Sequence, residues 1–214
     1  MGKDKVHTVY KLKDGTRVIG VTTALGILAK PALIHWSWNL GCQGIDYRKF
    51  RDDKADIGTL VHHLVLCYLK GDKPDTSDYT KNQIDQAENC MLSFYEWRKG
   101  KLLTPYIVEE PMVSERWGFG GMPDFYGLVD EVPTLLDFKT GKGIYPEMSY
   151  QLAAYRELLM EQREYVENCA ILNIGRAEDE AFQYQNYPDL EHEWEIFKAC
   201  LNIYNLQKAI KKRG

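Results

Sequence analysis

The chain has 214 residues, of which 44% are hydrophobic and 27% are charged, so it is long enough for one globular domain with a substantial core. No stretch is long and apolar enough to cross a membrane, and residues 1–10 lack the apolar segment of a secretory signal, so we expect a cytoplasmic protein without membrane contact. The formal net charge of −4 disfavours a general nucleic-acid coat protein, although local basic patches can still bind a phosphate backbone.

The first part of the chain is predicted to contain a hairpin followed by helices. Asp14-Gly15 is a turn signal within residues 7–22, which we expect to form the hairpin. Thr22 or Thr23 can cap a short helix that runs to Ala29, and a second helix is predicted over residues 32–40. Two longer amphipathic helices are predicted next, over residues 53–70, where Gly71 ends the helix, and over residues 78–99.

The pattern then changes from helical to extended. Three consecutive strands are predicted over residues 106–114, 120–129 and 134–139, with turns near residues 116–118 and 130–131. A helix over residues 146–162, a strand over 167–174, a further strand over 180–184 and a final helix over 188–211 complete the order. This order predicts an α/β sandwich around a mixed sheet. We expect one domain over residues 1–214, with an N-terminal hairpin and helices (1–52), a core (53–175) and a C-terminal strand and helix (176–214).

The cysteines do not form a recognisable motif. The count is odd and no two lie close together, which predicts reduced and mostly buried thiols without a disulfide framework or a C-x-x-C metal clamp. The five positions are Cys42, Cys67, Cys90, Cys169 and Cys200.

The main candidate for a catalytic site lies on two of the predicted strands. Because strand side chains alternate in direction, Asp137 and Lys139 emerge on one face and Phe138 on the other. In a hairpin, the carboxylate of Asp124 on the preceding strand can approach that of Asp137. Two close carboxylates repel each other unless a cation lies between them, and Mg²⁺ or Mn²⁺ suits such oxygen ligands. The alternative is a structural salt bridge between Asp137 and Lys139 on a solvated face.

Lys139 is then placed to orient or deprotonate a water, or to stabilise charge on a phosphoryl group. Two helices can contribute further groups. His62 lies four residues after Gly58 on the same helical face and can supply a nitrogen ligand. The alternative is an ordinary polar histidine of an amphipathic helix. Gln151 and Tyr155 are one helical turn apart, so they either face the cleft together or divide between surface and core.

The motifs around His62, Asp124, Lys139 and Gln151 follow one another along the chain. Their combined order resembles the RecB-like branch of the PD-(D/E)XK nuclease superfamily, which includes phage-type exonucleases. The motifs cover roughly residues 58–155, and segment 20–36 is similar to the N-terminal helices of phage-type members. The matching motifs are G-x-x-x-H ending at His62, G-G-x-x-D ending at Asp124, L-D-F-K-T-G-K around Lys139, and Q-L-A-A-Y from Gln151.

The resemblance implies a restriction-endonuclease-like core and a set of roles. It implies His62, Asp124, Asp137 and the Phe138 carbonyl as ligands of Mg²⁺ or Mn²⁺, and Lys139 as the catalytic lysine. Gln151, Tyr155 and Glu110 become substrate-binding candidates, with Glu109 competing for the last role. The family's acid before x-Lys is often Glu, and Asp137 is an accepted variant. Cys169 and Cys200 are too far apart for the iron–sulfur cluster of some members, so no cluster is expected.

Substrate contacts are also predicted near the N-terminal helices. Trp36 and Arg48 can stack on bases and bind backbone phosphates, although tryptophans are usually core residues and the basic run contains Asp52 and Asp53. We expect a DNA exonuclease of phage or prophage recombination and repair, with linear DNA as its substrate and a phage single-strand annealing protein as a possible partner. The alternatives are a structure-specific endonuclease and a nucleic-acid-binding module without cleavage activity.

Overall fold

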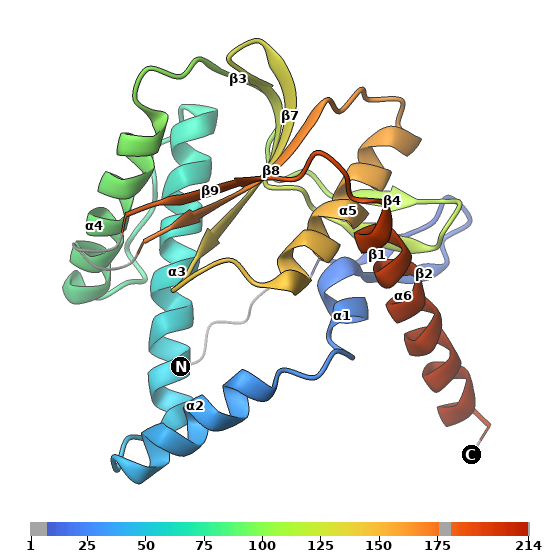
Figure 1. Cartoon of the computed structure of the whole chain (residues 1–214), viewed down its shortest axis with the longest axis horizontal. Coiled ribbons are helices and arrows are strands. Elements are labelled where there is room, and N and C mark those ends of the chain that lie inside the picture. Colours follow the sequence, from blue (N-terminus) through green and yellow to red (C-terminus); the bar gives the residue numbers. More distant parts are fainter. Residues whose placement is uncertain (1–7, 176–180, 214) are drawn as a thin grey trace.

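The computed structural model describes residues 8–175 and 181–213, which form two β-sheets with helices packed around them (Figure 1). The helices are α1 (Val21–Leu25), α2 (Pro31–Cys42), α3 (Tyr47–Lys70), α4 (Lys81–Arg98), α5 (Pro146–Glu161) and α6 (Glu191–Lys211). The strands are β1 (Tyr10–Lys11), β2 (Arg17–Gly20), β3 (Leu103–Ile107), β4 (Met112–Ser114), β5 (Phe119–Gly121), β6 (Phe125–Val129), β7 (Val132–Thr140), β8 (Asn168–Ile174) and β9 (Gln183–Asn186).

The larger sheet is mixed and has the order β3-β6-β7-β8-β9. β3, β6 and β7 are successive antiparallel neighbours, whereas β8 runs parallel to β7 and antiparallel to β9. A parallel pair needs a long crossover connection, which α5 supplies. The β6–β7 hairpin turns at Asp130 and Glu131, both of which have positive φ angles (50° and 69°), so the predicted turn is confirmed.

The smaller sheet corrects the prediction of three long strands. Residues 106–114 and 120–129 each divide between two sheets, because β4 and β5 leave the larger sheet and pair with the N-terminal hairpin in the order β1-β2-β5-β4. Pro111 and Pro123 lie at the two breaks, where they cannot donate a ladder hydrogen bond. Glu109 has a positive φ of 54°, which also takes the chain out of the strand.

The predicted helices are present, with corrected ends. α3 begins at Tyr47 rather than at residue 53, because the Asp46 carboxylate accepts from the backbone N–H groups of Arg48 and Lys49 and so caps the helix. Gly71, at φ 73°, ends it as predicted. α1 begins after Gly20 with no side-chain cap, so the expected threonine cap is wrong. The predicted strand over 180–184 is β9, displaced to Gln183–Asn186; Glu180 itself lies outside the described residues.

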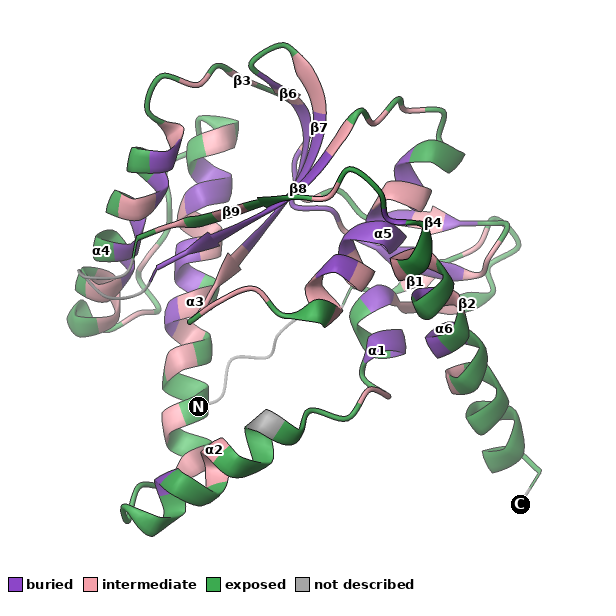
Figure 2. Cartoon of the chain, in the orientation of Figure 1, coloured by how far each residue is buried: buried purple, intermediate pink, exposed green. Residues whose placement is uncertain are grey.

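The larger sheet separates two apolar cores, as the buried residues in Figure 2 show. One core joins α3 and α4 to the sheet face that carries Leu136, Phe138 and Leu172. The other joins α1, α5, α6 and the smaller sheet to the face that carries Leu135 and Ile171. Asp137, between Leu136 and Phe138, therefore points to the α5 side. Helices thus flank a mixed sheet on both faces, and α1 and α2 form an N-terminal helical extension, which confirms the predicted α/β fold class.

Two other predictions can be compared with the structure. The cysteines are free, with Cys42 exposed and Cys67, Cys90, Cys169 and Cys200 buried, which confirms mostly buried thiols. Across residues 8–175 and 181–213, the helices are either too short or too polar to cross a membrane.

Gly127 in β6 provides a test of the packing between β3 and β6. A Cβ atom there would overlap the Thr104 carbonyl oxygen and lie 2.9 Å from Pro105 Cα, and backbone atoms cannot move aside as a flexible side chain can. We expect Gly127→Ala to lower the free energy of unfolding by about 1–3 kcal/mol or more, measured by urea titration. The matched control is Gly41→Ala in α2, where a Cβ meets nothing within 4 Å and a gain of about 0.5–1 kcal/mol is expected. Equal stability of the Gly127 variant and the wild type would contradict the tight strand approach.

Candidate active site

Two aspartates meet at the open end of the β6–β7 hairpin. Phe125 pairs with Leu136, so Asp124 lies beside the end of β7 that carries Asp137. The Asp124 Oδ2 atom accepts a hydrogen bond of 2.8 Å from the backbone N–H of Phe138. The structure therefore confirms that the hairpin brings Asp124 to the strand of Asp137.

Both carboxylates are buried, and different groups offset the cost of burying each charge. Asp137 is 0% exposed and Asp124 is 7% exposed. The Lys139 ammonium contacts Asp137 Oδ2 as an ion pair, which agrees with the prediction that the two side chains share a face of β7. Asp137 Oδ1 has no hydrogen-bond partner among the described residues. A buried oxygen of this kind carries a desolvation cost that a cation or donor would offset.

His62 reaches the same site from α3. The apolar stripe of α3, which includes Leu60, Val61 and Val65, is buried against the sheet, and this packing fixes the neighbouring His62. Its Nε2 atom lies 3.0 Å from Asp124 Oδ2. Asp124 therefore joins α3 to β7, because the same oxygen also accepts from the Phe138 backbone. The structure thus brings the predicted residues His62, Asp124, Asp137 and Lys139 together.

The two aspartates have shifted pKa values of opposite sign. Burial raises the pKa of Asp137 to about 6, because the loss of solvation outweighs the attraction of the Lys139 ammonium, and the Asp124 charge adds to the rise. Burial also acts to raise the pKa of Asp124, but the His62 charge and hydrogen bond, Lys139 and the Phe138 N–H together lower it below its ordinary value. At neutral pH, Asp124 is the more firmly ionised carboxylate of the two.

The surroundings of the two basic groups favour their charged forms. Burial disfavours the charge on His62, but the Asp124 carboxylate and its hydrogen bond outweigh burial and raise the pKa of the imidazole. Burial likewise disfavours the charge on Lys139, and Asp137 and Asp124 outweigh it, so the pKa of Lys139 is raised. Buried acids and bases that perturb each other in this way are typical of functional sites.

α5 closes the site from the other side. Gln151 Nε2 donates a hydrogen bond of 2.8 Å to the Tyr155 hydroxyl. Burial raises the pKa of Tyr155 well above its usual value, and the charges of Asp137 and Asp124 add to the shift, so this phenol lies close to both carboxylates. Gly121 leaves room for the ring, because a Cβ there would lie 2.7 Å from Tyr155 Cε1. Gln151 and Tyr155 thus lie together at the site rather than dividing between surface and core.

The donor set suits a hard divalent cation, although its members are now paired with each other. Within the described ranges, no group of three or more His, Cys, Asp and Glu side chains has the geometry of a preformed metal cage. His62 is occupied by Asp124 and Asp137 by Lys139. Two buried carboxylates with one orphaned oxygen and an adjacent imidazole nevertheless fit the ligand preferences of Mg²⁺ or Mn²⁺. Ligation by the Phe138 carbonyl stays a prediction.

Of the two competing glutamates, Glu109 lies nearer to the site. Its backbone N–H donates to the carbonyl oxygens of Pro123 and Asp124, at 3.1 and 3.3 Å, and its charge contributes to the raised pKa of His62. Glu110 is exposed. By proximity, Glu109 is therefore the better candidate of the two for the predicted acidic position.

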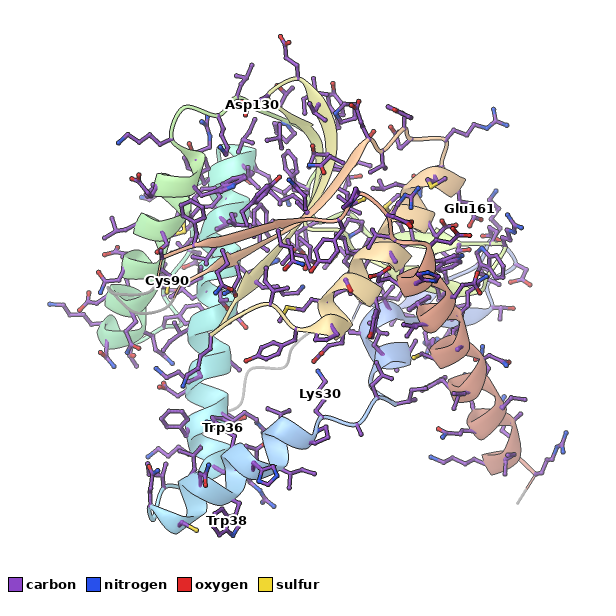
Figure 3. The ribbon with its side chains drawn as sticks, viewed as in Figure 1. Lys30, Trp36, Trp38, Cys90, Asp130 and Glu161 are labelled. Atoms are coloured by element: carbon purple, nitrogen blue, oxygen red, sulfur yellow. The ribbon has the colours of Figure 1, made fainter. Side chains whose placement is uncertain are left out.

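The structure does not bring Trp36 and Arg48 to the carboxylates. Trp36 makes edge-to-face contacts with Tyr47 and Phe50, with ring centroids 5.4 and 5.9 Å apart, so it joins α2 to α3, whereas Trp38 is 68% exposed and points away (Figure 3). Arg48 precedes His62 by fourteen residues on α3, which is about 21 Å along the helix.

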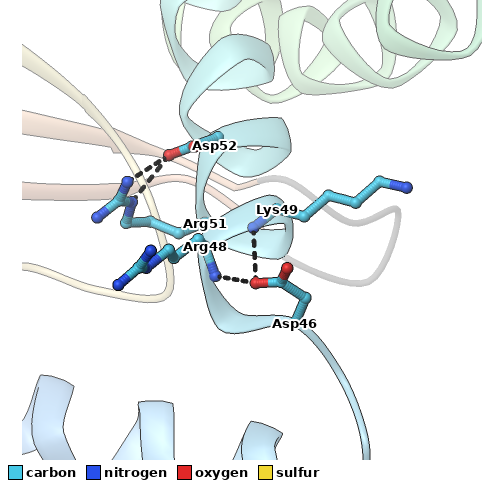
Figure 4. Close-up of polar contacts among 5 residues, drawn as sticks. All are labelled: Asp46, Arg48, Lys49, Arg51 and Asp52. Atoms are coloured by element: carbon cyan, nitrogen blue, oxygen red, sulfur yellow. Dashed lines mark hydrogen bonds and ion pairs between the residues drawn. The ribbon is translucent and has the colours of Figure 1, made fainter.

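The basic run at the start of α3 is partly neutralised. Arg51 donates two hydrogen bonds to Asp52, at 2.9 and 2.7 Å, whereas Arg48 and Lys49 bond Asp46 only through their backbone N–H groups (Figure 4). The Arg48 side chain is exposed and remote from Lys139, so the two residues cannot contact the same phosphate group.

Sequence reasoning missed Asn173, a buried polar residue that neighbours Lys139 in the β7–β8 register. Its Nδ2 atom donates 3.0 Å to the Gly141 carbonyl and so fixes the loop that follows Lys139. Its Oδ1 atom has no partner among the described residues. The signal was present in the sequence: an asparagine interrupts the otherwise apolar end of this strand.

Comparison with known proteins gives a weak structural likeness. No protein-family model and no curated protein matches the chain. An alkaline exonuclease from Laribacter hongkongensis is similar over 75% of this chain and 91% of its own, with 18% identity and a TM-score of 0.36. The same enzyme in complex with dAMP is similar over 72% and 85%, with 17% identity and a TM-score of 0.34. At these values the likeness does not indicate a function for this chain, which must be inferred from the geometry of the site.

The raised pKa of Asp137 predicts a pH dependence of stability without metal. The folded carboxyl holds its proton up to about pH 6, whereas the unfolded one loses it near pH 3.9. Relative to Asp137→Asn, wild type should therefore lose stability as the pH rises from 4 to 6 and change little above that. Urea titrations across this range measure the difference. An exposed aspartate, in the control Asp85→Asn, should give a smaller dependence, and a wild-type advantage that grows with pH would contradict the assignment.

Proposed function

We propose that the chain is a Mg²⁺- or Mn²⁺-dependent DNA exonuclease of the PD-(D/E)XK superfamily. The observation that carries the proposal is the convergence of two buried carboxylates, an imidazole and a lysine, with the Asp137 Oδ1 atom left unpartnered. Residues from three separate sequence motifs therefore lie together in the fold. A structural salt bridge on a solvated face does not account for it, because Asp137 is completely buried.

His62, Asp124 and Asp137 would hold the divalent ion, with the Phe138 carbonyl as a further oxygen ligand. When bound, such an ion lowers the pKa of water and neutralises charge on a phosphoryl oxygen. To ligate it, Asp137 must release Lys139 and His62 must give up its proton to become a neutral ligand. Without the ion, the His62–Asp124 and Asp137–Lys139 pairs would keep the site nearly charge-balanced.

Lys139 would serve as a cation rather than as a base. Its pKa is raised by Asp137 and Asp124, so its ammonium persists at neutral pH and can donate to a phosphoryl oxygen that gains negative charge. The Tyr155 hydroxyl accepts from Gln151, and its own O–H can still donate. Gln151 and Tyr155 would therefore orient a phosphate or base over the carboxylates.

The wider substrate path would include the start of α3. Arg48 lies about 21 Å from His62 along the helix, so it would contact the backbone several nucleotides from the cut. A role in phage or prophage recombination and repair, with a single-strand annealing protein as partner, completes the proposal and follows from the motif resemblance alone.

DNA cleavage provides the direct test. Wild type is incubated with linear and with covalently closed circular DNA in the presence of Mg²⁺ or Mn²⁺. We expect loss of the linear DNA alone, and a loss of rate of at least about 100-fold in Lys139→Ala, because one charge-stabilising donor typically contributes 10²–10³. The matched control is Lys99→Ala, which removes an exposed lysine at the end of α4 and should retain the wild-type rate.

Other outcomes of that experiment are equally informative. Cutting of the circle would replace the exonuclease assignment with an endonuclease of the same chemistry. Absence of cleavage of single- and double-stranded DNA with either metal would favour a binding module and refute the proposal.

Metal binding should depend on pH, because protons compete for two of the ligands. Asp137, with a pKa of about 6, and His62, with a raised pKa, must both be deprotonated to ligate. Calorimetric titration with Mn²⁺ should show several-fold tighter binding at pH 8 than at pH 5.5. Asp137→Asn should remove most of the Mn²⁺ binding, because it removes a ligand. The control Asp85→Asn should bind as wild type does. Equal affinity at both pH values would place the ion elsewhere.

A further inference from the structure

α6 carries two separate apolar faces. One face, with Phe197, Cys200 and Leu201, is buried in the core shared with α1 and α5. The other face is exposed and consists of Ile196, Ala199, Ile203, Leu206 and Ile210. An amphipathic helix that only covers its own domain needs the first face but not the second.

The exposed face has the spacing of a helix-pairing seam. Its members follow one another at intervals of three, four, three and four residues, which is the repeat of a coiled-coil stripe. The exposed fractions rise along the helix: Ile196 37%, Ile203 45%, Leu206 57% and Ile210 67%. Single exposed apolar residues are ordinary, but a contiguous stripe of this regularity marks an interaction surface.

The second half of α6 also leaves the body of the protein. From Asn202 to Lys211, every residue except Tyr204 is exposed, and the ribbon runs away from the sheets (Figures 1 and 2). Helical turns without tertiary packing are marginal in water. A partner that covered the stripe would therefore stabilise this segment.

The charges of α6 indicate what that partner is. Its first turns carry Glu191, Glu193 and Glu195, and its end carries Lys208, Lys211, Lys212 and Arg213. Acidic and basic ends complement the helix macrodipole within one chain. They also make the helix complementary to itself when two copies run antiparallel, since each basic end then lies beside the other acidic end. A parallel pair would place like charges together.

We propose that the chain forms a two-fold symmetric dimer through antiparallel pairing of α6 with α6 of a second copy. The pairing places Ile203 opposite the small Ala199 of the second copy and Leu206 opposite Ile196. In this register, Lys208 and Lys211 of each copy lie beside the acidic first turns of the other. Each contact occurs twice, as an isologous interface requires. This assembly is independent of the proposed nuclease activity, and neither depends on the other for its test.

The mass in solution provides the first test. Analytical ultracentrifugation of the full chain at tens of micromolar should give twice the mass of one chain for wild type and one chain mass for Leu206→Glu. Leu206 is 57% exposed, so the substitution spares the core, and circular dichroism checks the fold. Asn205→Glu adds the same charge one position away, off the stripe, and should remain dimeric. A monomeric wild type, or a dimer that survives Leu206→Glu, would overturn the proposal.

Disulfide trapping tests the direction of the helices. In a Cys42→Ser background, which removes the exposed native thiol, Ile196→Cys and a size-tagged Leu206→Cys are mixed and oxidised. Antiparallel pairing predicts the mixed disulfide between the two variants. Disulfides that form only between identical variants would show parallel pairing and contradict the proposed geometry.

Discussion

The burial of two carboxylates at one end of the β6–β7 hairpin is the constraint on which the rest of the site depends. The Asp124 charge helps to raise the pKa of Asp137, and both carboxylates are buried, so bulk water screens their charges poorly. Ionised groups in such surroundings are costly unless they are paired. The protein meets this cost from two directions: His62 reaches Asp124 from α3, and Lys139 reaches Asp137 from the same strand.

Helices on the two faces of the larger sheet supply different side chains to this site. On one face, α3 packs against β7 and delivers an imidazole; on the other, α5 packs against the same strand and delivers a phenol and an amide. The crossover between β7 and β8 makes this possible, because it returns the chain over the face on which Asp137 points. The parallel strand β8 then places Asn173 next to Lys139 and fixes the following loop.

Local patterns in the sequence were sufficient for much of this arrangement. Alternation along residues 134–139 correctly placed Asp137 and Lys139 on one face, and helical spacing paired Gln151 with Tyr155. What depends on long-range packing was not predictable. The departure of β4 and β5 to a second sheet depends on the pairing of β5 with β2, which lies far away in sequence. The position of Arg48 depended on where α3 begins, and hence on the cap by Asp46. Trp36 packs against Tyr47 and Phe50 at the junction of α2 and α3. The residues next to Trp36 in the sequence do not predict this packing.

The placement of His62 on a different layer from the other site residues has a consequence for how the protein unfolds. α3 and α4 share one core with each other and with one sheet face, whereas α5 belongs to the opposite core and β7 contributes to both. Proteins open in cooperative units that follow such divisions. Detachment of the α3–α4 layer would withdraw the imidazole while the hairpin, β8 and α5 stay assembled. The four side chains of the site can therefore stand together only while the α3–α4 layer is docked on the sheet.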